Sequence, residues 1–398
     1  VRVLARLFLA GALQMSGESN QAYAAIYHGF EEEEIQSDAF KATLVMTVCW
    51  LHWVDANLQG MAQAASQCIS LSQQSSIPQI LNYGHYHLGR VCYQQNDLAA
   101  AEEHFGAVVQ QPYLNYGNCF AYGACGLALV HQAQSRTDKA QAVIEAVSMF
   151  LLETGNTTLM PVIQAFQTEF VLGQGRIATA SQWAAQLDPG PPLAPMVELF
   201  SPHLSLVKVW LAQDTPASRE RAADLLERSR DLVETTHNTR FLIEVLALQA
   251  MLKDGQGERQ AALVLLEQAV TRAEPGGFIR LFVDLGSRLV SLLNQLRQQG
   301  LALDYLGQVL AAFPDPGQAD RATADREQDT QNLVEALTPR ELEVLVLLDR
   351  HLTNKEIAEK LVVSPSTVKT HTLNIYHKLE VNGRKQAVAR ARELSMLS

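Results

Sequence analysis

Apolar residues recur three or four positions apart along almost the whole chain up to about Phe313, and turn signals interrupt them every 15 to 20 residues. This period puts one apolar stripe on each of many short helices. Stretches rich in strand-forming residues are absent. The pattern therefore predicts an all-α fold.

The clearest unit spans residues 87–112, "HLGRVCYQQNDLAAAEEHFGAVVQQP", and reads as two helices joined at "QND". Its expected packing positions are Leu88, Gly89 and either Cys92 or Tyr93 on the first helix, then Ala101, Phe105 and Val108 on the second, which Pro112 ends. Small residues let two helices approach closely, and an aromatic side chain fills the space between neighbouring pairs. The unit resembles a tetratricopeptide repeat.

Weaker copies of this pattern occur at residues 9–26, 126–147, 170–187 and 247–275. A single helix pair cannot bury its apolar face, so several pairs must stack into a solenoid. We expect a tetratricopeptide-like helical-repeat solenoid over residues 1–313. The proline-rich residues 188–195 predict a possible break in it.

Charge is distributed unevenly beyond this array. Residues 314–336 contain prolines and charged residues but no aromatic residue, which predicts a linker. Residues 338–398 hold 10 Lys and Arg against 7 Asp and Glu, a net charge of +3, whereas the preceding 337 residues carry −14. A mildly basic unit at 337–398 points to nucleic acid at the C-terminal end.

Four short helices are predicted in this C-terminal unit from their start signals. Thr338 with Glu341, and Thr353 with Glu356, have the spacing of capping boxes. The third helix opens at 364–365 with Ser and Pro, and the fourth follows 382–383, Asn and Gly. The second and third helices, joined by a three-residue turn, have the proportions of a helix-turn-helix.

The third helix has two distinct faces when projected at about 100° per residue. Val368, Thr372, Ile375 and Leu379 form the apolar face, which predicts contact with the core, and Tyr376 lies at its margin. The opposite face carries Ser366, Lys369, Thr370, Leu373 and His377. A solvated helix surface is the simpler interpretation of such a face. The helix-turn-helix layout, the local positive charge and the polar residues at helix starts favour DNA instead.

These segments resemble a known family. "LTPRE", "NKEIAEKL", "STVKTH", "NIYHKL" and "AVARARELSML" follow in the order and at the spacing of the DNA-binding domain of LuxR-type transcription regulators. With "AEPGGFIRLFVDLGSRLVSLL" and the repeats before it, the chain resembles the MalT-like branch, the large ATP-binding LuxR regulators. No G-x-x-x-x-G-K-[ST] loop occurs in the chain, so the nucleotide-binding domain of that branch cannot be assigned within it. Either the chain comes from a longer parent, or this form lacks the nucleotide switch. The absent initiator methionine favours a longer parent chain.

The resemblance implies a four-helix LuxR-type helix-turn-helix domain whose recognition helix runs from about Pro365 to Leu379. It implies base-reading roles for Lys369, Thr370 and Leu373. Leu373 stands where the family commonly has a polar residue, so we interpret it as a contact to a thymine methyl group. DNA-backbone contacts are implied for Asn354, Lys355, Ser366, Thr367, His377, Lys378, Arg384 and Lys385. A dimer face on the fourth helix is implied for Ala387, Val388, Ala391 and Leu394.

The sequence gives little support for a metal site, a cofactor site or a catalytic site. His85, His87 and Cys92 are near one another, but packing explains them better than a metal site, and we assign no metal, cofactor or catalytic residue. The five cysteines include no C-x-x-C pair, which fits reduced thiols in a cytoplasmic protein. No apolar run is long enough to span a membrane.

The sequence thus predicts a non-enzymatic transcription regulator that binds double-stranded DNA as a homodimer, with an unknown small-molecule or protein effector at its helical repeats. The alternative is an interaction scaffold whose repeats bind a protein and whose C-terminal domain only dimerises. The basic C-terminal unit and Lys369 disfavour that alternative.

Overall fold

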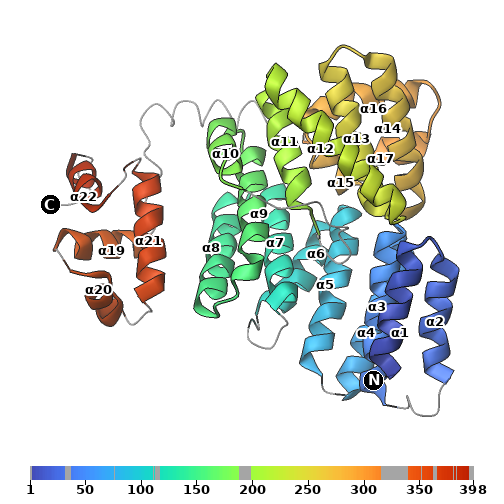
Figure 1. The fold of residues 1–398 in the computed structure, drawn as a ribbon, viewed down its shortest axis with the longest axis horizontal. Helices are drawn as coiled ribbons and strands as arrows, with labels where there is room; N and C mark the ends of the chain where they lie inside the picture. The colour runs from blue at the N-terminus through green and yellow to red at the C-terminus, as the bar shows by residue number, and fades with distance from the viewer. Residues whose placement is uncertain are drawn as a thin grey trace. The chain divides into compact units, whose positions relative to one another are not determined.

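The computed structural model describes residues 2–31, 37–75, 77–110, 112, 117–187, 199–314, 339–350, 352–361, 365–379, 381 and 383–393. Every regular element in these residues is a helix, which confirms the all-α prediction (Figure 1). Contacts divide the chain into two compact units, residues 1–147 with 158–313, and residues 314–398 with 148–157. The predicted break at 188–195 and residues 315–336 of the predicted linker lie outside the described residues.

The helical array, residues 2–311, consists of helix pairs followed by a shorter terminal group. The pairs are α1 (Arg2–Met15) and α2 (Ser19–Glu31), α3 (Asp38–Val54) and α4 (Leu58–Ser75), α5 (Pro78–Gln94) and α6 (Leu98–Val109), α7 (Gly117–Ala133) and α8 (Thr137–Glu153), α9 (Met160–Gly173) and α10 (Ile177–Ala184), α11 (Pro202–Gln213) and α12 (Pro216–Thr235), and α13 (Thr239–Gly255) and α14 (Arg259–Ala273). The terminal group is η3 (Glu274–Gly276), α15 (Arg280–Val283), η4 (Ser287–Leu289), α16 (Val290–Gln298) and α17 (Leu303–Ala311). A further short helix, η2 (Thr157–Leu159), precedes α9.

A left-handed residue marks the turn inside the first six pairs. These residues recur every 39 or 40 positions, at Gly17, Ala56, Asn96, Ser135, Gly175 and Asp214. In all but the last turn, the next residue donates its backbone N–H to the carbonyl five positions back, as Asp97 does to Cys92 at 2.8 Å. Such bonds satisfy carbonyls that the helix end leaves open. The repeat predicted from the hydrophobic pattern is therefore also a repeat of backbone geometry.

The predicted unit at 87–112 forms α5 and α6. Asp97 caps α6 by accepting a hydrogen bond from the Ala100 N–H at 3.1 Å. Phe105 is fully buried, and a Cβ added to Gly89 or Gly126 would lie 2.7 or 2.5 Å from its ring. The aromatic side chain therefore fills the space that two glycines leave, which confirms the predicted roles of Gly89 and Phe105, whereas Leu88 is only partly buried. Of the two alternatives on α5, Tyr93 is buried and Cys92 is only half-buried.

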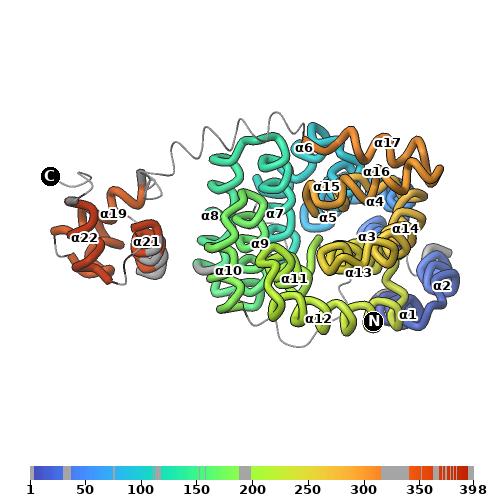
Figure 2. Tube along the Cα trace, turned by 90° about the horizontal axis from the view of Figure 1, so that it is seen from above, coloured from blue at the N-terminus to red at the C-terminus, as the bar shows by residue number. Residues whose placement is uncertain are grey.

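The odd-numbered helices form an inner layer. Each of α3, α5, α7, α9 and α11 contacts the next odd helix, and α13 and α15 contact α3 and α5 in turn. The array therefore returns on itself, so that segments far apart in sequence lie side by side (Figure 2).

The C-terminal unit contains α19 (Pro339–Asp349), α20 (Asn354–Leu361), α21 (Pro365–Lys378) and α22 (Arg384–Glu393). Its core consists of Val344, Leu345, Leu347, Leu348, Ile357, Ala358, Val368, Ile375, Leu379, Ala387 and Ala391. All four helices contribute to this small core, which fixes the position of α21.

Candidate nucleic-acid interface

The start of α20 is held by the predicted capping box. The Glu356 carboxylate accepts hydrogen bonds from the Thr353 N–H at 2.7 Å and its hydroxyl at 2.8 Å, and the Glu356 N–H donates to Thr353 Oγ1 at 3.3 Å. These bonds hold the pKa of Glu356 below its ordinary value. Reciprocal capping fixes where α20 begins and hence the path into the following turn.

The apolar face of α21 packs as predicted. Val368 and Ile375 are fully buried, Leu379 is 1% exposed, and the Thr372 hydroxyl donates to the Val368 carbonyl at 2.8 Å. Tyr376, at the margin of this face, is partly buried, and burial raises its pKa. One side of α21 therefore packs against the core, and the other side is available for contact with another molecule.

Lys369 is exposed on α21. Ser366, Thr370, Leu373 and His377 belong to the same helix, but their side chains lie outside the described residues, as does Leu394. Lys355 and Lys385 are exposed, and Asn354 is partly exposed at the first turn of α20. Solvent-accessible cations are thus present on α20, α21 and α22.

Lys378 has a different role from the predicted phosphate contact. It is only 9% exposed, and its Nζ donates to Glu341 Oε2 at 2.8 Å, while Glu341 itself is 1% exposed. This buried ion pair joins the end of α21 to the start of α19. The predicted backbone role for Lys378 is therefore corrected, because its ammonium group is already bound inside the domain. Thr338, the predicted capping partner of Glu341, lies outside the described residues.

Arg384 is likewise used within the domain. Its guanidinium donates to the Leu348 carbonyl from Nε at 3.1 Å and from Nη2, and to the Leu352 carbonyl from Nη1 at 2.7 Å. These carbonyls belong to the last turn of α19 and the segment after it, where carbonyls lack helical partners. Thr367 is 2% exposed, so its side chain is also directed into the domain. Neither residue fits the predicted phosphate role.

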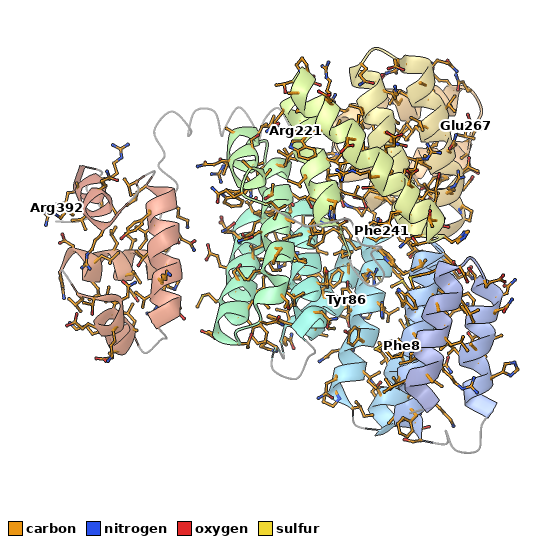
Figure 3. The ribbon with its side chains drawn as sticks, in the orientation of Figure 1. Phe8, Tyr86, Arg221, Phe241, Glu267 and Arg392 are labelled. Carbon is orange, nitrogen blue, oxygen red and sulfur yellow. The ribbon has the colours of Figure 1, made fainter. Side chains whose placement is uncertain are left out.

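The predicted dimer face needs a similar correction. Ala387 and Ala391 are fully buried in the core of their own domain, so they cannot meet a partner. Val388 is partly exposed, and Ala389 beside it is exposed. Arg392, which is labelled in Figure 3, extends from α22 and pairs with Asp349 of α19 at 2.9 Å. Only the outer side of α22 remains open to contact.

Besides Arg384, two further cations hold the domain together in a way that sequence reasoning did not anticipate. Arg340 Nη2 donates to the Leu361 carbonyl at the end of α20 at 2.7 Å, and Lys378 pairs with Glu341. Lys378 lies beside Ile375 and Leu379 in helical projection, and this position at the edge of the apolar face was the available signal. Arg340 gave no such signal, because its acceptor lies in another helix.

Comparison with known proteins assigns both units. Residues 335–391 match the bacterial regulatory proteins of the luxR family. Residues 1–299, three quarters of the chain, match the MalT-like TPR region. The chain belongs to the MalT-like TPR family. The resemblance predicted from the sequence motifs is thereby confirmed for both regions.

Individual relatives of this MalT-like chain are regulators. It is 28% identical over 183 residues to the HTH-type transcriptional regulator MalT of Vibrio campbellii, covering 42% of this chain and 20% of that protein. It is 32% identical over 182 residues to MalT of Klebsiella pneumoniae strain 342, covering 42% and 19%. Over 57 residues it is 53% identical to the transcriptional regulatory protein LiaR of Bacillus subtilis, covering 14% and 27%. The MalT-like chain thus spans about a fifth of the length of these MalT relatives.

Membrane-spanning helices and metal-binding clusters are both absent from the described residues. No helix in the described ranges is long and apolar enough to cross a membrane. No group of three or more His, Cys, Asp or Glu side chains that could hold a metal ion occurs within them.

Proposed function

We propose that the chain is a non-enzymatic, DNA-binding transcription regulator of the bacterial cytoplasm, in which the C-terminal domain binds promoter DNA and the helical array receives a small-molecule or protein signal. The observation that carries this proposal is the arrangement of α21, which buries Val368 and Ile375 and leaves Lys369 exposed. A helix held in this way can enter a major groove about 12 Å wide. The match of residues 335–391 to the luxR family supports the same conclusion.

The proposed base-reading residues are Lys369, Thr370 and Leu373. Lysine donates to the acceptors on guanine, and an apolar side chain distinguishes thymine by its methyl group. The proposed backbone set is now Asn354, Lys355, Ser366, His377 and Lys385. This set no longer includes Lys378 and Arg384, whose side chains are hydrogen-bonded within the domain. It also omits Thr367, whose side chain is buried.

We further propose that the regulator binds DNA as a homodimer through the outer side of α22. Val388 and Ala389 supply an apolar patch there that the domain's own core does not cover fully. Paired half-sites about 34 Å apart, or a multiple of it, are the expected operator geometry.

The first prediction tests the recognition helix. An operator sequence can be selected from a random DNA library with the unaltered chain. Lys369→Ala in the full chain should weaken the preference for that operator over random DNA by about 1–3 kcal/mol, because one base contact is lost. Lys139→Ala removes the same charge from an exposed position on α8 and is the matched control. Binding should be measured by fluorescence anisotropy on operator and random duplexes. Intact sequence preference in Lys369→Ala would show that α21 does not read the bases as assigned.

The same titrations address the scaffold alternative. Phosphate contacts make affinity fall as salt rises, with a logarithmic slope of about −0.9 for each contact. If the unaltered chain bound no DNA even at low salt yet retained a stoichiometric protein partner, the scaffold function would replace the one proposed.

The second prediction concerns Leu373. Leu373→Arg should change the preferred base at one operator position, by about 1 kcal/mol or more, because a thymine methyl contact is replaced by a guanine-reading side chain. Selection from a randomised operator library measures this change. Leu303→Arg, at an exposed position on α17, adds the same side chain outside the domain. An unchanged base preference would contradict the proposed thymine contact.

A further inference from the structure

Two parts of the helical array that are far apart in sequence meet along a seam. On one side lie residues 53–56 of α3 and its following turn, with residues 90–95 of α5. On the other side lie Arg240 of α13 and residues 276–284, which include α15. The Ile279 N–H donates to the Gln94 carbonyl at 2.7 Å, and the Tyr93 hydroxyl donates to Asp284 at 2.8 Å. We call this contact region the seam; Figure 2 shows α13 beside α3 and α15 beside α5 along it.

The outer part of the seam is polar. Arg280 pairs with Asp284 and lies over the Tyr93 ring, 5.4 Å from its centroid. Burial raises the pKa of Tyr93, and the Asp284 carboxylate raises it further, so the hydroxyl stays protonated and donates. Water could replace each of these contacts if the two sides separated.

The inner part of the seam is a stack of cations and aromatic rings. Arg90 lies 3.6 Å and Arg240 lies 4.9 Å from the centroid of the Trp53 ring. Tyr86 and Phe241, labelled in Figure 3, extend the stack, because Arg90 also lies over Tyr86 and Arg240 over Phe241. Phe278 adds a ring centroid 6.2 Å from that of Trp53.

These guanidinium groups are almost completely removed from water, with Arg90 0% and Arg240 3% exposed. Cation–aromatic attraction is strongest in such desolvated positions, but the lost hydration opposes it. If the seam opened, both guanidinium groups would regain water, which would offset part of the cost of the broken contacts. Opening would also expose Trp53 and Phe278, which are fully buried, so the open form lies above the closed form in free energy.

The helix pairs do not depend on the seam. In a solenoid each pair is stabilised by its neighbours along the chain. One contact inside the array, Phe105 between Gly89 and Gly126, is apolar and closely packed. The seam can thus break while every helix pair remains folded.

We propose that the seam is a conformational switch between two forms of the array. In the closed form, residues 276–284 contact residues 53–56 and 90–95. In the open form these contacts are broken, and the repeats stay folded. The signal acts by selecting one of these forms, a step that rests on the proposed sensing function. A ligand shifts such an equilibrium only by its difference in affinity for the two forms.

The Ile279 amide reports directly on seam opening, since its acceptor lies across the seam, whereas amides inside α5 and α13 bond within their own helices. Hydrogen exchange at single-residue resolution should show Ile279 exchanging faster than the buried α5 and α13 amides, with little dependence on denaturant. Tyr93→Phe should speed exchange of Ile279 about tenfold, the effect of one lost hydrogen bond to a charged group. Asp284→Asn should act in the same direction.

Tyr83→Phe is the matched control. It removes a hydroxyl from the same helix, but that hydroxyl donates to Asn118 of the adjacent α7 at 2.8 Å and does not cross the seam. Exchange of Ile279 should be unchanged in this variant. The proposal is overturned if Ile279 exchanges only together with the α5 and α13 core in the unaltered chain, or if Tyr93→Phe leaves it unaffected. DNA binding does not enter this measurement, so failure of the switch and failure of the proposed DNA-binding function are distinguishable.

Discussion

At the scale of one residue, Lys378 shows how burial changes the role of a charged side chain. The family resemblance implied a phosphate contact for Lys378, which lies on the recognition helix of a unit of net charge +3. The structure instead pairs its ammonium with Glu341 at 2.8 Å, in a site where both side chains are at most 9% exposed. The pair fixes the end of α21 against α19. Lys378 therefore positions the helix that we propose reads DNA, and Lys369 remains the exposed cation on that helix.

The third prediction follows from this burial. Lys378→Met leaves the Glu341 carboxylate buried without its cation, which should lower the free energy of unfolding of the C-terminal unit by about 3 kcal/mol. The double variant Lys378→Met with Glu341→Gln should be more stable than the single variant, because no buried charge remains. Hydrogen exchange of the α19 and α21 core amides measures both values. Equal stability of the single and double variants would indicate that the two charges are not coupled.

At the scale of the helix and its turns, the sequence was most informative where the causes are local. The Thr353–Glu356 capping box and the helix pair α5–α6 depend on residues a few positions apart, and both were predicted correctly. Ala387 and Ala391 are buried in the core of their own domain, and the dimer role implied by the family resemblance is incompatible with that burial. The Arg384 contacts depend on where α19 ends relative to α22, which no local pattern specifies.

The fourth prediction compares two glycines of the same repeat. Gly89→Ala places a Cβ 2.7 Å from the buried Phe105 ring, so the array should lose about 1–3 kcal/mol of stability through overpacking. Gly106, within α6, has open space around the corresponding position. Gly106→Ala should therefore be neutral or stabilise the array by up to about 1 kcal/mol through helix propensity. Urea unfolding followed by tryptophan fluorescence measures both variants, and equal effects would contradict the packing role of Gly89.

At the scale of the whole molecule, composition separates an acidic array from a basic C-terminal unit but does not reveal what lies inside either. The seam joins residues such as Tyr93 and Asp284, 191 positions apart, and no periodicity or spacing indicates such a contact. The array also encloses a network of charges contributed by Glu169, Lys208, Arg240 and Glu244, from α9, α11 and α13. Its residues look like ordinary surface charges in the sequence, because helix projection alone does not show that a second layer covers them.

Glu244 makes this network sensitive to acid. Its side chain is 5% exposed, Lys208 Nζ lies 2.9 Å from its Oε1, and Arg240 bonds its other oxygen. Burial alone would raise the pKa of Glu244, but the two cations outweigh it and lower the pKa to about 2. A carboxyl group whose pKa is lower in the folded protein than in the unfolded chain stabilises the fold above its unfolded pKa, near 4.5. That contribution is lost as the pH falls from about 4.5 toward 2.

The fifth prediction uses this direction. Glu244→Gln should destabilise the array at pH 7 by on the order of 2–3 kcal/mol, because two buried cations lose their shared carboxylate. Between pH 5 and about pH 3 the variant should lose less further stability than the unaltered chain, since this titration is gone. Glu267→Gln removes the same charge from an exposed position on α14 and should follow the unaltered profile. The urea midpoint of each protein should be measured across this pH range. Parallel profiles for Glu244→Gln and the unaltered chain would mean that the buried network does not hold Glu244 ionised.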